Sequence, residues 1–230
     1  MRTFRWCFIG MVIFAVFTLL AGLLIWYALK CEPTFYKNQK VNNREHAEIN
    51  SKSMNQKVYA LRNDLRNPEA HEWTLEFTEM ELNHWLEIDI KKKHPGAIPR
   101  RISEPRGIIR ENMISCGAKV DLKKDQYAFQ GVASVDFLPE LVAPNVFEFK
   151  IFDIRAGIIS LPRGIMLKKL AEIAEELAFP VEWEKKDGYH IMRITFIPGE
   201  LQSEGRDLTI HEIKLGHGKI LIRGSIAAKK

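Results

Sequence analysis

An uncharged apolar run near the start of the chain constrains it more than any other feature: "CFIGMVIFAVFTLLAGLLIWYAL", residues 7–29. As an α-helix this run would be roughly 35 Å long, at a rise of about 1.5 Å per residue. That length crosses a hydrocarbon core about 30 Å thick with some tilt. Trp6, Trp26 and Tyr27 lie near its ends, where aromatic rings favour the membrane interface. The run predicts a single membrane-spanning helix.

A cleaved signal peptide is the competing interpretation of the same run. Its apolar core would be shorter, about 7 to 15 residues, and would end in a small-x-small cleavage site. This run ends in "WYALKC", and Lys30 directly precedes Cys31, where a lipoprotein-type cleavage site needs a small residue. The pattern therefore favours a retained anchor over residues 1–30.

The charges that flank the run predict its orientation only weakly, because they nearly cancel. Arg2 and Arg5 lie on one side; the other side carries Lys30, Lys37, Lys40 and Arg44. A short tail ahead of a long apolar helix resembles a signal anchor, which keeps the tail in the cytoplasm. We therefore expect the large C-terminal part to lie outside the cytoplasm.

The remaining composition excludes some classes of partner. The formal net charge is +5, but 34 Lys and Arg residues are spread among 29 Asp and Glu residues, and only "KKKH" at 91–94 forms a basic run. Aromatic residues are not interleaved with it, as a base-stacking surface would require. Nucleic acid is therefore not an expected partner, whereas mild basicity suits a domain held near anionic lipid headgroups.

The chain has three cysteines, Cys7, Cys31 and Cys116. No two of them have the C-x-x-C spacing that would indicate zinc or redox chemistry. A disulfide between Cys31 and Cys116 is conceivable in a domain outside the cytoplasm. Two unpaired thiols are the simpler expectation, and no cofactor is expected.

After the anchor, the chain divides into a polar segment and a compact domain. Residues 31–70 form the polar segment, within which 44–66 has a helix-forming composition and a narrow apolar stripe, which predicts a juxtamembrane helix or stalk. Pro68 disfavours a helical Asn67 and ends it. Residues 71–230 are enough for one domain with one core.

The fold class expected for this domain is α+β: a mainly antiparallel sheet covered by two helices. Alternating apolar and polar residues predict strands at 114–122, 127–137, 147–154, 189–197, 207–215 and 218–226. One face of such strands is apolar and the other polar, which is typical of antiparallel sheets. The apolar phase shifts after Ile151 to Phe152 and Ile154, which predicts a bulge or a crossing of the core.

The two helices are predicted at the start of the domain and in its middle. "PRGIMLKKLAEIAEELAF", from 162, begins with Pro162, is ended by Pro180, and carries its apolar residues on one side: Met166, Leu170, Ile173 and Leu177. Just before it, Gly157 permits a bulge or a close backbone approach.

The first helix begins in "FTEMELNHWLEIDI", residues 77–90. Thr78 and Glu81 have the spacing of a capping box, in which each side chain binds the other residue's backbone N–H. Leu82, Trp85 and Leu86 form an apolar stripe, and we expect Trp85 to anchor the helix to the sheet. Asn83 is unfavourable in mid-helix, so its amide is expected to bind the backbone of a neighbouring segment.

Candidate metal ligands in this chain have weak support. Glu81 and His84 match the E-x-x-H spacing of di-iron helical bundles, but that site needs a second E-x-x-H, which the sequence lacks. In "HEIKLGH", His211 and His217 are six apart rather than four and lie on a predicted strand and turn, so we expect surface residues. Serine-elbow, phosphate-loop and dinucleotide motifs are also missing. We predict no catalytic, cofactor-binding or metal-binding residues, and no enzyme.

A resemblance covers most of residues 73–226. "FTEMELNHWL", followed by "IPRRISEPRGIIRENMI", "AGIISLPRGIMLKKL" and "VEW", resembles a group of uncharacterised single-pass membrane proteins of planctomycete-type bacteria. More loosely it is similar to YpmS-like anchored extracytoplasmic domains. The resemblance implies an extracytoplasmic α+β domain of unknown function, anchored in the bacterial inner (cytoplasmic) membrane, and it lends only distant support to lipid handling.

Two classes of function remain after these exclusions. The first is a binding module that holds a lipid or another apolar ligand on the apolar face of its sheet. The second is a structural or assembly factor that binds another protein of the cell envelope. An unrecognised hydrolase ranks third, because convergent active sites need no sequence motif.

Overall fold

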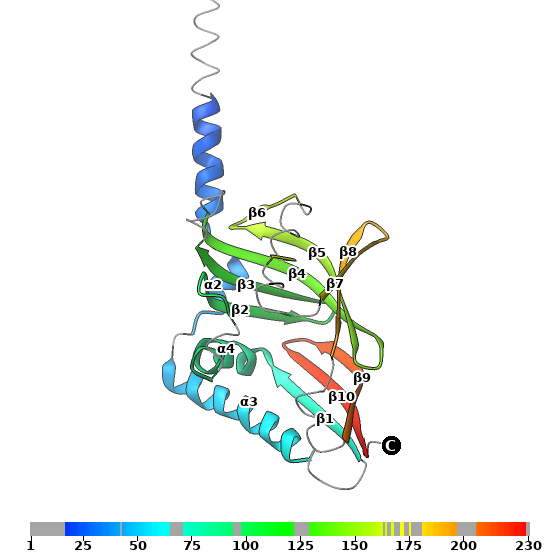
Figure 1. Ribbon diagram of the computed structural model, residues 1–230. Coiled ribbons are helices and arrows are strands. Elements are labelled where there is room, and N and C mark those ends of the chain that lie inside the picture. Colours follow the sequence, from blue (N-terminus) through cyan, green and yellow to red (C-terminus); the bar gives the residue numbers. More distant parts are fainter. Residues whose placement is uncertain are drawn as a thin grey trace, which may run out of the picture.

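A computed structural model describes residues 17–41, 43–64, 71–93, 98–121, 129–162, 181–196 and 206–228, with five single positions between 164 and 175. A helix over residues 17–30 projects away from a domain of strands and helices (Figure 1). Within the described residues, no helix has both the length and the hydropathy of a membrane span. Residues 7–16 of the predicted span lie outside them.

Helices and strands follow along the rest of the described chain. The helices are α2 (Thr34–Asn38), α3 (Arg44–Asp64) and α4 (Glu79–Lys93). The strands are β1 (His71–Thr78), β2 (Ile102–Arg110), β3 (Met113–Asp121), β4 (Gln130–Ala143), β5 (Val146–Ala156), β6 (Ile159–Ser160), β7 (Val181–Lys186), β8 (Tyr189–Thr195), β9 (Arg206–Gly216) and β10 (Lys219–Ala228).

The strands form two sheets, in which every described pairing is antiparallel. The larger sheet has the order β2-β3-β4-β5-β8-β7, with β6 paired to β5, and the smaller sheet has the order β1-β10-β9. Figure 1 shows the larger sheet curving around the side of the domain nearer the projecting helix, with the smaller sheet on the far side. The predicted α+β class with a mainly antiparallel sheet is confirmed.

The predicted bulge in β5 is also confirmed. Opposite β5, Asp136 pairs with Asp153 while the next residue, Phe137, pairs with Ile151, so Phe152 is the extra residue. A bulge of this kind resets the alternation of faces. Ile151 and Ile154 can therefore both be buried, although they are three residues apart.

The smaller sheet has one apolar face and one polar face. Trp73, opposite Gly224, lies on the apolar face with Leu208, Ile210 and Ile226. A side chain on Gly224 would overlap the Trp73 indole, so only glycine lets this ring lie flat on β10. Leu141 and Phe147 of the larger sheet pack against the same cluster. The apolar faces of the two sheets therefore meet at this cluster.

The edge of β2 is satisfied by side chains of α4 instead of by another strand. The Asn83 carbonyl oxygen accepts from the Gly107 N–H at 2.7 Å, and its amide donates to the Gly107 C=O at 2.8 Å. One turn earlier in the helix, Glu79 accepts from the Ile109 N–H at 2.7 Å. The prediction that Asn83 binds a neighbouring backbone is confirmed, and α4 is thereby fixed along this edge.

A second edge, that of β9, is satisfied by the turn between β4 and β5. Asn145, at a positive φ of 61°, accepts from the Ile210 N–H at 2.7 Å and donates to the Leu208 C=O at 3.0 Å. Its backbone N–H donates to the Ile210 C=O at 3.3 Å. Asparagine tolerates this left-handed conformation better than most residues. One residue therefore closes both the turn and the junction between the sheets.

The helix predicted over 44–66 is observed as α3, and it lies against α4 with Ala47, Ser51 and Met54 buried. Hydrogen bonds of Ser51 and Asn55 to Asp89 join the two helices. Of the apolar residues in this helix, Met54 is buried, whereas Ile49 and Val58 are 61% and 44% exposed, so the predicted stripe packs on the domain only in part. The division of the chain at residue 71 remains a prediction.

The predicted middle helix is described only at single positions, all of them helical. Of these, Leu167 is buried against Ile151 and Ile154 on the larger sheet. The four apolar residues named for this helix, Met166, Leu170, Ile173 and Leu177, lie outside the described residues.

Four observed strands were not predicted: β1, β2, β7 and the two-residue β6. β1 carries a clear alternation of Trp73, Leu75 and Phe77, which the helix-start signal at its end obscured. β2 contains Pro105 and Gly107, and β7 is short and mostly charged, so neither has a strong strand pattern. Both are edge strands, where such residues are tolerated.

Candidate functional site

The helix over residues 17–30 is apolar and exposed on all sides. Among its exposed side chains are Phe17, Leu19, Leu20, Leu23, Leu24, Ile25, Trp26 and Tyr27, each at least 52% exposed. A helix that packs on a domain shows one apolar stripe, whereas one that is apolar all round is suited to a large protein core or to lipid. Near its end, the Lys30 ammonium lies 5.2 Å from the centroid of the Trp26 ring.

The end of this helix is seated on the turn between β5 and β6. The Ile158 N–H donates to the Ala28 C=O at 3.2 Å. Gly157, at a φ of 60°, lies so close that a Cβ on it would overlap the backbone of Ala28 and Leu29. The predicted close approach at Gly157 is confirmed, and its partner is the base of the N-terminal helix.

A buried tyrosine fixes the next segment to β2. Tyr36 in α2 is fully buried, and its hydroxyl donates to the Glu104 C=O at 2.7 Å. The Arg106 guanidinium lies 4.4 Å from the centre of the Tyr36 ring and donates to the Tyr36 C=O at 3.2 Å. Burial is the main cause that raises the pKa of Tyr36, so the hydroxyl stays protonated as a donor. The helix therefore leaves the domain through an ordered connection.

The two sheets present apolar side chains toward the same interior, and many of them keep partial exposure. On the smaller sheet these are Leu75, Phe77, Ile213, Leu215, Ile220 and Ile222; on the larger sheet they are Val135, Phe137, Phe147, Phe149, Met192 and Ile194. Leu167 covers the centre of the larger sheet's face, at Ile151 and Ile154. The interior thus combines a packed centre with apolar surroundings that are only partly covered.

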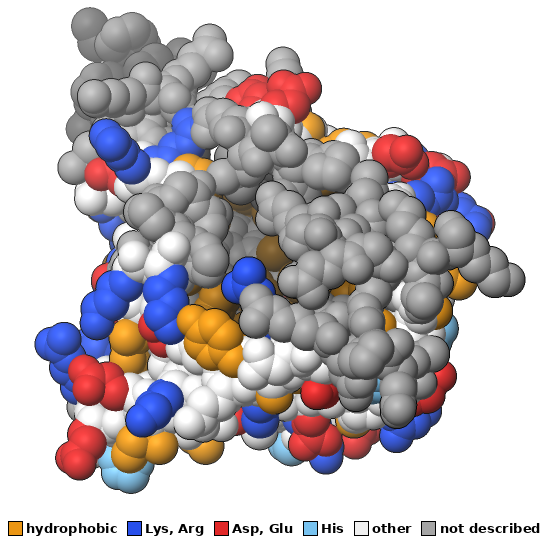
Figure 2. Space-filling view, turned by 60° about the horizontal axis from the view of Figure 1, so that its bottom comes forward, with side chains coloured by type: hydrophobic (Ala, Val, Ile, Leu, Met, Phe, Trp, Pro, Cys, Tyr) orange, Lys and Arg blue, Asp and Glu red, His pale blue; other side chains and the backbone are white. Residues whose placement is uncertain are grey.

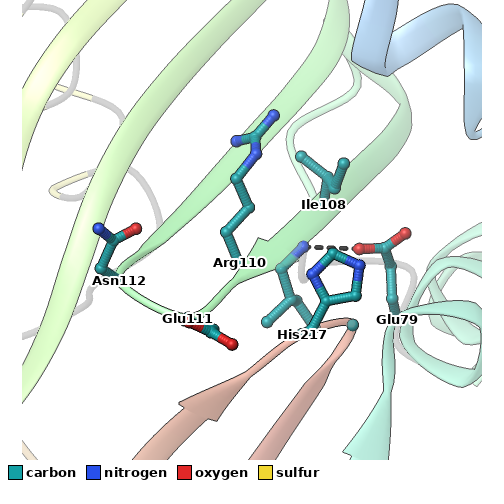
Figure 3. A pocket seen from close by; sticks show the side chains of 8 residues that line it. Glu79, Ile108, Arg110, Glu111, Asn112 and His217 are labelled. Carbon is teal, nitrogen blue, oxygen red and sulfur yellow. Dashed lines mark hydrogen bonds between the residues drawn. The ribbon is translucent and has the colours of Figure 1, made fainter.

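A cavity of about 340 Å³ lies where the two sheets approach each other (Figure 3). Two backbone hydrogen bonds join the β9–β10 turn to its neighbours here. The Gly218 N–H in this turn donates to the Ile109 C=O on β2 at 3.0 Å, and the Glu79 N–H at the start of α4 donates to the Gly218 C=O at 2.8 Å. The labelled lining is mostly polar, with Arg110, Glu111, Asn112 and His217 around it. Its charges of both signs do not single out one ligand.

A second cavity, of about 360 Å³, lies in the groove between α3 and α4. Asp89 and Lys93 are on its α4 side, and Ser51, Asn55 and Tyr59 are on its α3 side. Hydrogen bonds from Ser51, Asn55 and Lys93 lower the pKa of Asp89 despite its burial, which acts in the opposite direction. These polar groups already bind one another, so the groove joins two helices.

The capping box predicted at the start of α4 is confirmed. The Thr78 N–H donates to the Glu81 carboxylate at 2.9 Å, and the Glu81 N–H donates to the Thr78 hydroxyl at 3.2 Å. The carboxylate also accepts from Ser53 at 2.6 Å and from Lys57 at 2.8 Å, both on α3. Burial acts to raise the pKa of Glu81, but these hydrogen bonds outweigh it and lower the pKa to about 2.

The E-x-x-H pair does not come together as a metal site. The Glu81 oxygens are bound to an ammonium and to hydroxyl groups, and His84 Nδ1 lies 3.0 Å from Asn50 Nδ2. Burial, with a contribution from His46, lowers the pKa of His84. No cluster of His, Cys, Asp or Glu with metal-ligand geometry occurs among the described residues.

The two histidines expected at the surface are exposed, and the two cysteines expected to be unpaired form no disulfide with each other. His211 and His217 are exposed, and His211 Nε2 lies 2.7 Å from the Ser225 hydroxyl. Cys31 and Cys116 are free thiols; burial is the main cause that raises the pKa of Cys116 to about 12, so its sulfur is unreactive. Cys7 lies outside the described residues.

Charged side chains of both signs are mixed over the face shown in Figure 2, with small apolar areas between them. On the outer face of the larger sheet, Arg193 bridges Glu148 at 2.5 Å and Glu184 at 3.1 Å. Such cross-strand ion pairs leave little net charge for a polyanion to bind.

No protein-family model, no curated protein and no solved structure matches this chain. The functional interpretation therefore rests on the geometry of the chain itself.

Sequence reasoning missed the residues that seat the N-terminal helix. Tyr36 and Arg106 lie 70 residues apart, and neither belongs to a recognisable motif. Glu104, which Arg106 contacts at 2.8 Å, has a positive φ of 50° beside Pro105. The sequence "SEPRG" contains a proline and a glycine, but it gave no indication of the partner of Arg106.

Proposed function

We propose that this protein is a single-pass membrane protein whose α+β domain lies outside the cytoplasm and binds a lipid or another apolar ligand. The anchor would be the apolar run 7–29, which ends in the exposed apolar helix at 17–30. The observation that carries this part is the exposure of that helix on all sides, with Ile25, Trp26 and Tyr27 all more than half exposed. Such a surface is stable in lipid and costly in water.

The ligand-binding part is supported by the interior between the two sheets. Its apolar side chains would need a cover, and the described covering residue Leu167 meets only the centre of one face. Apolar ligands bind in sites of this kind, lined by aliphatic and aromatic side chains with few polar groups. Phe137, Phe147 and Phe149 lie in ring contact along this face and would supply that lining.

Native mass spectrometry of the full-length protein, extracted gently from membranes, tests the ligand. We expect a bound, lipid-sized mass that persists when detergent is removed in the gas phase. The fraction of protein that carries this mass should fall in Phe149→Asp, which places a charge in the interior. Phe149→Leu is the matched control and should retain the ligand. Absence of any bound mass at activation energies that preserve the fold would remove the lipid proposal.

The orientation needs a separate experiment. An export-dependent reporter fused after Lys230 should be active, and a reporter that works only in the cytoplasm should be silent. The reverse pair of results would place the domain in the cytoplasm, while leaving the anchor itself in place.

The second candidate is an assembly factor that binds another protein of the cell envelope. It is favoured by the two cavities that the described residues line, because both are open and have charged side chains in their lining. A protein partner that co-purifies after cross-linking, together with a lipid-free mass spectrum, would favour this function.

A further inference from the structure

The turn between β5 and β6 holds an exposed apolar side chain beside the base of the N-terminal helix. Ile158 is 55% exposed, although isoleucine is among the residues most often buried. Its backbone N–H is bound to the Ala28 C=O, and Gly157 packs directly on Ala28 and Leu29. The position of Ile158 is therefore fixed relative to the helix.

The contact with Ala28 sets the depth at which the Ile158 turn would lie in the membrane. Ala28 follows Trp26 by two residues, which is about 3 Å along a helix. Trp26 and Tyr27 are exposed aromatic residues at the end of the apolar run, and such residues lie at the headgroup level. Each interfacial layer is about 5 to 8 Å thick. A turn bound to Ala28 consequently lies within that layer.

We propose that Ile158 is a second membrane contact, whose side chain inserts into the interfacial layer of the leaflet from which the helix emerges. This inference rests on the proposed function, because it needs the helix to be in the membrane. The partner is the lipid surface: the turn continues the apolar surface of the anchor, and Lys30, exposed beside Trp26, places a cation at the headgroups. The domain would thus rest against the bilayer in one orientation.

The test uses the full-length protein in lipid nanodiscs, with an environment-sensitive fluorophore on a single cysteine. Cys7, Cys31 and Cys116 are first replaced by alanine. The labelled positions are Ile158→Cys, Ile25→Cys as the anchor control, and Val58→Cys as the domain control. Val58 is 44% exposed on α3, and α3 lies on the side of the domain away from the N-terminal helix (Figure 1). The quenchers are lipids that carry a nitroxide at the headgroup or along the acyl chain.

We expect the Ile158 label to be quenched most by headgroup and shallow nitroxides, about threefold more than the Val58 label, as for a side chain at the interface. The Ile25 label should be quenched by nitroxides along the acyl chain. Quenching at Ile25 without quenching at Ile158 overturns this inference and leaves the anchor proposal standing. A blue-shifted but unquenched Ile158 label would indicate a protein partner and also overturns it. Failure of all three labels to be quenched overturns both proposals.

A second variant tests the seating of the turn. In Gly157→Ala the new Cβ meets the Ala28 carbonyl, so the turn must move. We expect quenching at Ile158 to fall at least twofold while quenching at Ile25 is unchanged. Gly164→Ala is the control, because a Cβ there meets no atom within 4 Å. Equal quenching in Gly157→Ala and Gly164→Ala would show that the helix base does not position Ile158.

Discussion

At the scale of single residues, Asn83 is the clearest link between α4 and the larger sheet. Its amide satisfies both the N–H and the C=O of Gly107, and it is itself 3% exposed. Asn83→Ala would leave two buried backbone groups without partners. We expect it to lower the free energy of unfolding by about 2 to 4 kcal/mol.

Denaturant unfolding of the full-length protein in detergent measures this change. Asn112→Ala is the matched control, because Asn112 is exposed in the β2–β3 turn, and it should change stability by less than about 0.5 kcal/mol. Equal effects of the two substitutions would contradict the role of Asn83.

Trp73 and Trp85 differ in burial, and this changes the expectation for Trp85, the residue predicted to anchor its helix to the sheet. Trp73 is 6% exposed in the smaller sheet's core, whereas Trp85, expected as the anchor of α4, is half-buried. Trp73→Ala should cost about 3 to 5 kcal/mol, and Trp85→Ala should cost less. His84→Ala should be nearly neutral. Thermal melts of the three variants test this order, and a larger loss for His84→Ala than for Trp85→Ala would contradict it.

At the scale of elements, Glu81 makes the packing of α3 on α4 dependent on pH. Its pKa of about 2 lies below the ordinary value of 4.5, so the ionised form stabilises the fold. This contribution is complete above about pH 5 and is lost as the pH falls from there toward 2, amounting to at most about 3 kcal/mol.

Comparing wild type with Glu81→Gln tests this contribution. The variant should be less stable at pH 7, and the difference should shrink as the pH falls toward 2 in denaturant titrations. A difference that stays constant with pH would show that the Glu81 charge does not hold the helices together.

Elements were predictable where local chemistry decides them. Thr78 and Glu81 bind each other's backbone N–H across three residues, so their spacing sufficed to predict the capping box. The bulge at Phe152 was predictable because it shifts the alternation of apolar residues along β5. The edge strands β2 and β7 were missed because an edge needs no continuous apolar pattern. The seat of the N-terminal helix depends on partners far apart in sequence, and no local pattern encodes such a pair.

At the scale of the whole molecule, Tyr36 controls how firmly the N-terminal helix is held to the domain. Tyr36→Phe keeps the ring under Arg106 but removes the hydrogen bond to Glu104, at a cost of about 1 to 2 kcal/mol. We expect trypsin to cleave faster at the exposed Lys37 and Lys40, by about 5- to 30-fold if local opening limits cleavage. Tyr59→Phe, at an exposed position on α3, is the control. Unchanged cleavage would contradict the role of Tyr36.

The hydrogen bonds of Asn83 to the β2 edge and of Asn145 to the β9 edge have a further consequence if the proposed anchor confines the protein to a membrane plane. Unpaired strand edges are templates on which a neighbouring copy can add a strand. In a bilayer, tethered copies meet often and in similar orientations, which makes such templating a particular hazard. Asn83 and Asn145 bind backbone groups of Gly107, Leu208 and Ile210 that an incoming strand would need, so under the proposed anchoring these two amide side chains would hinder strand addition between copies.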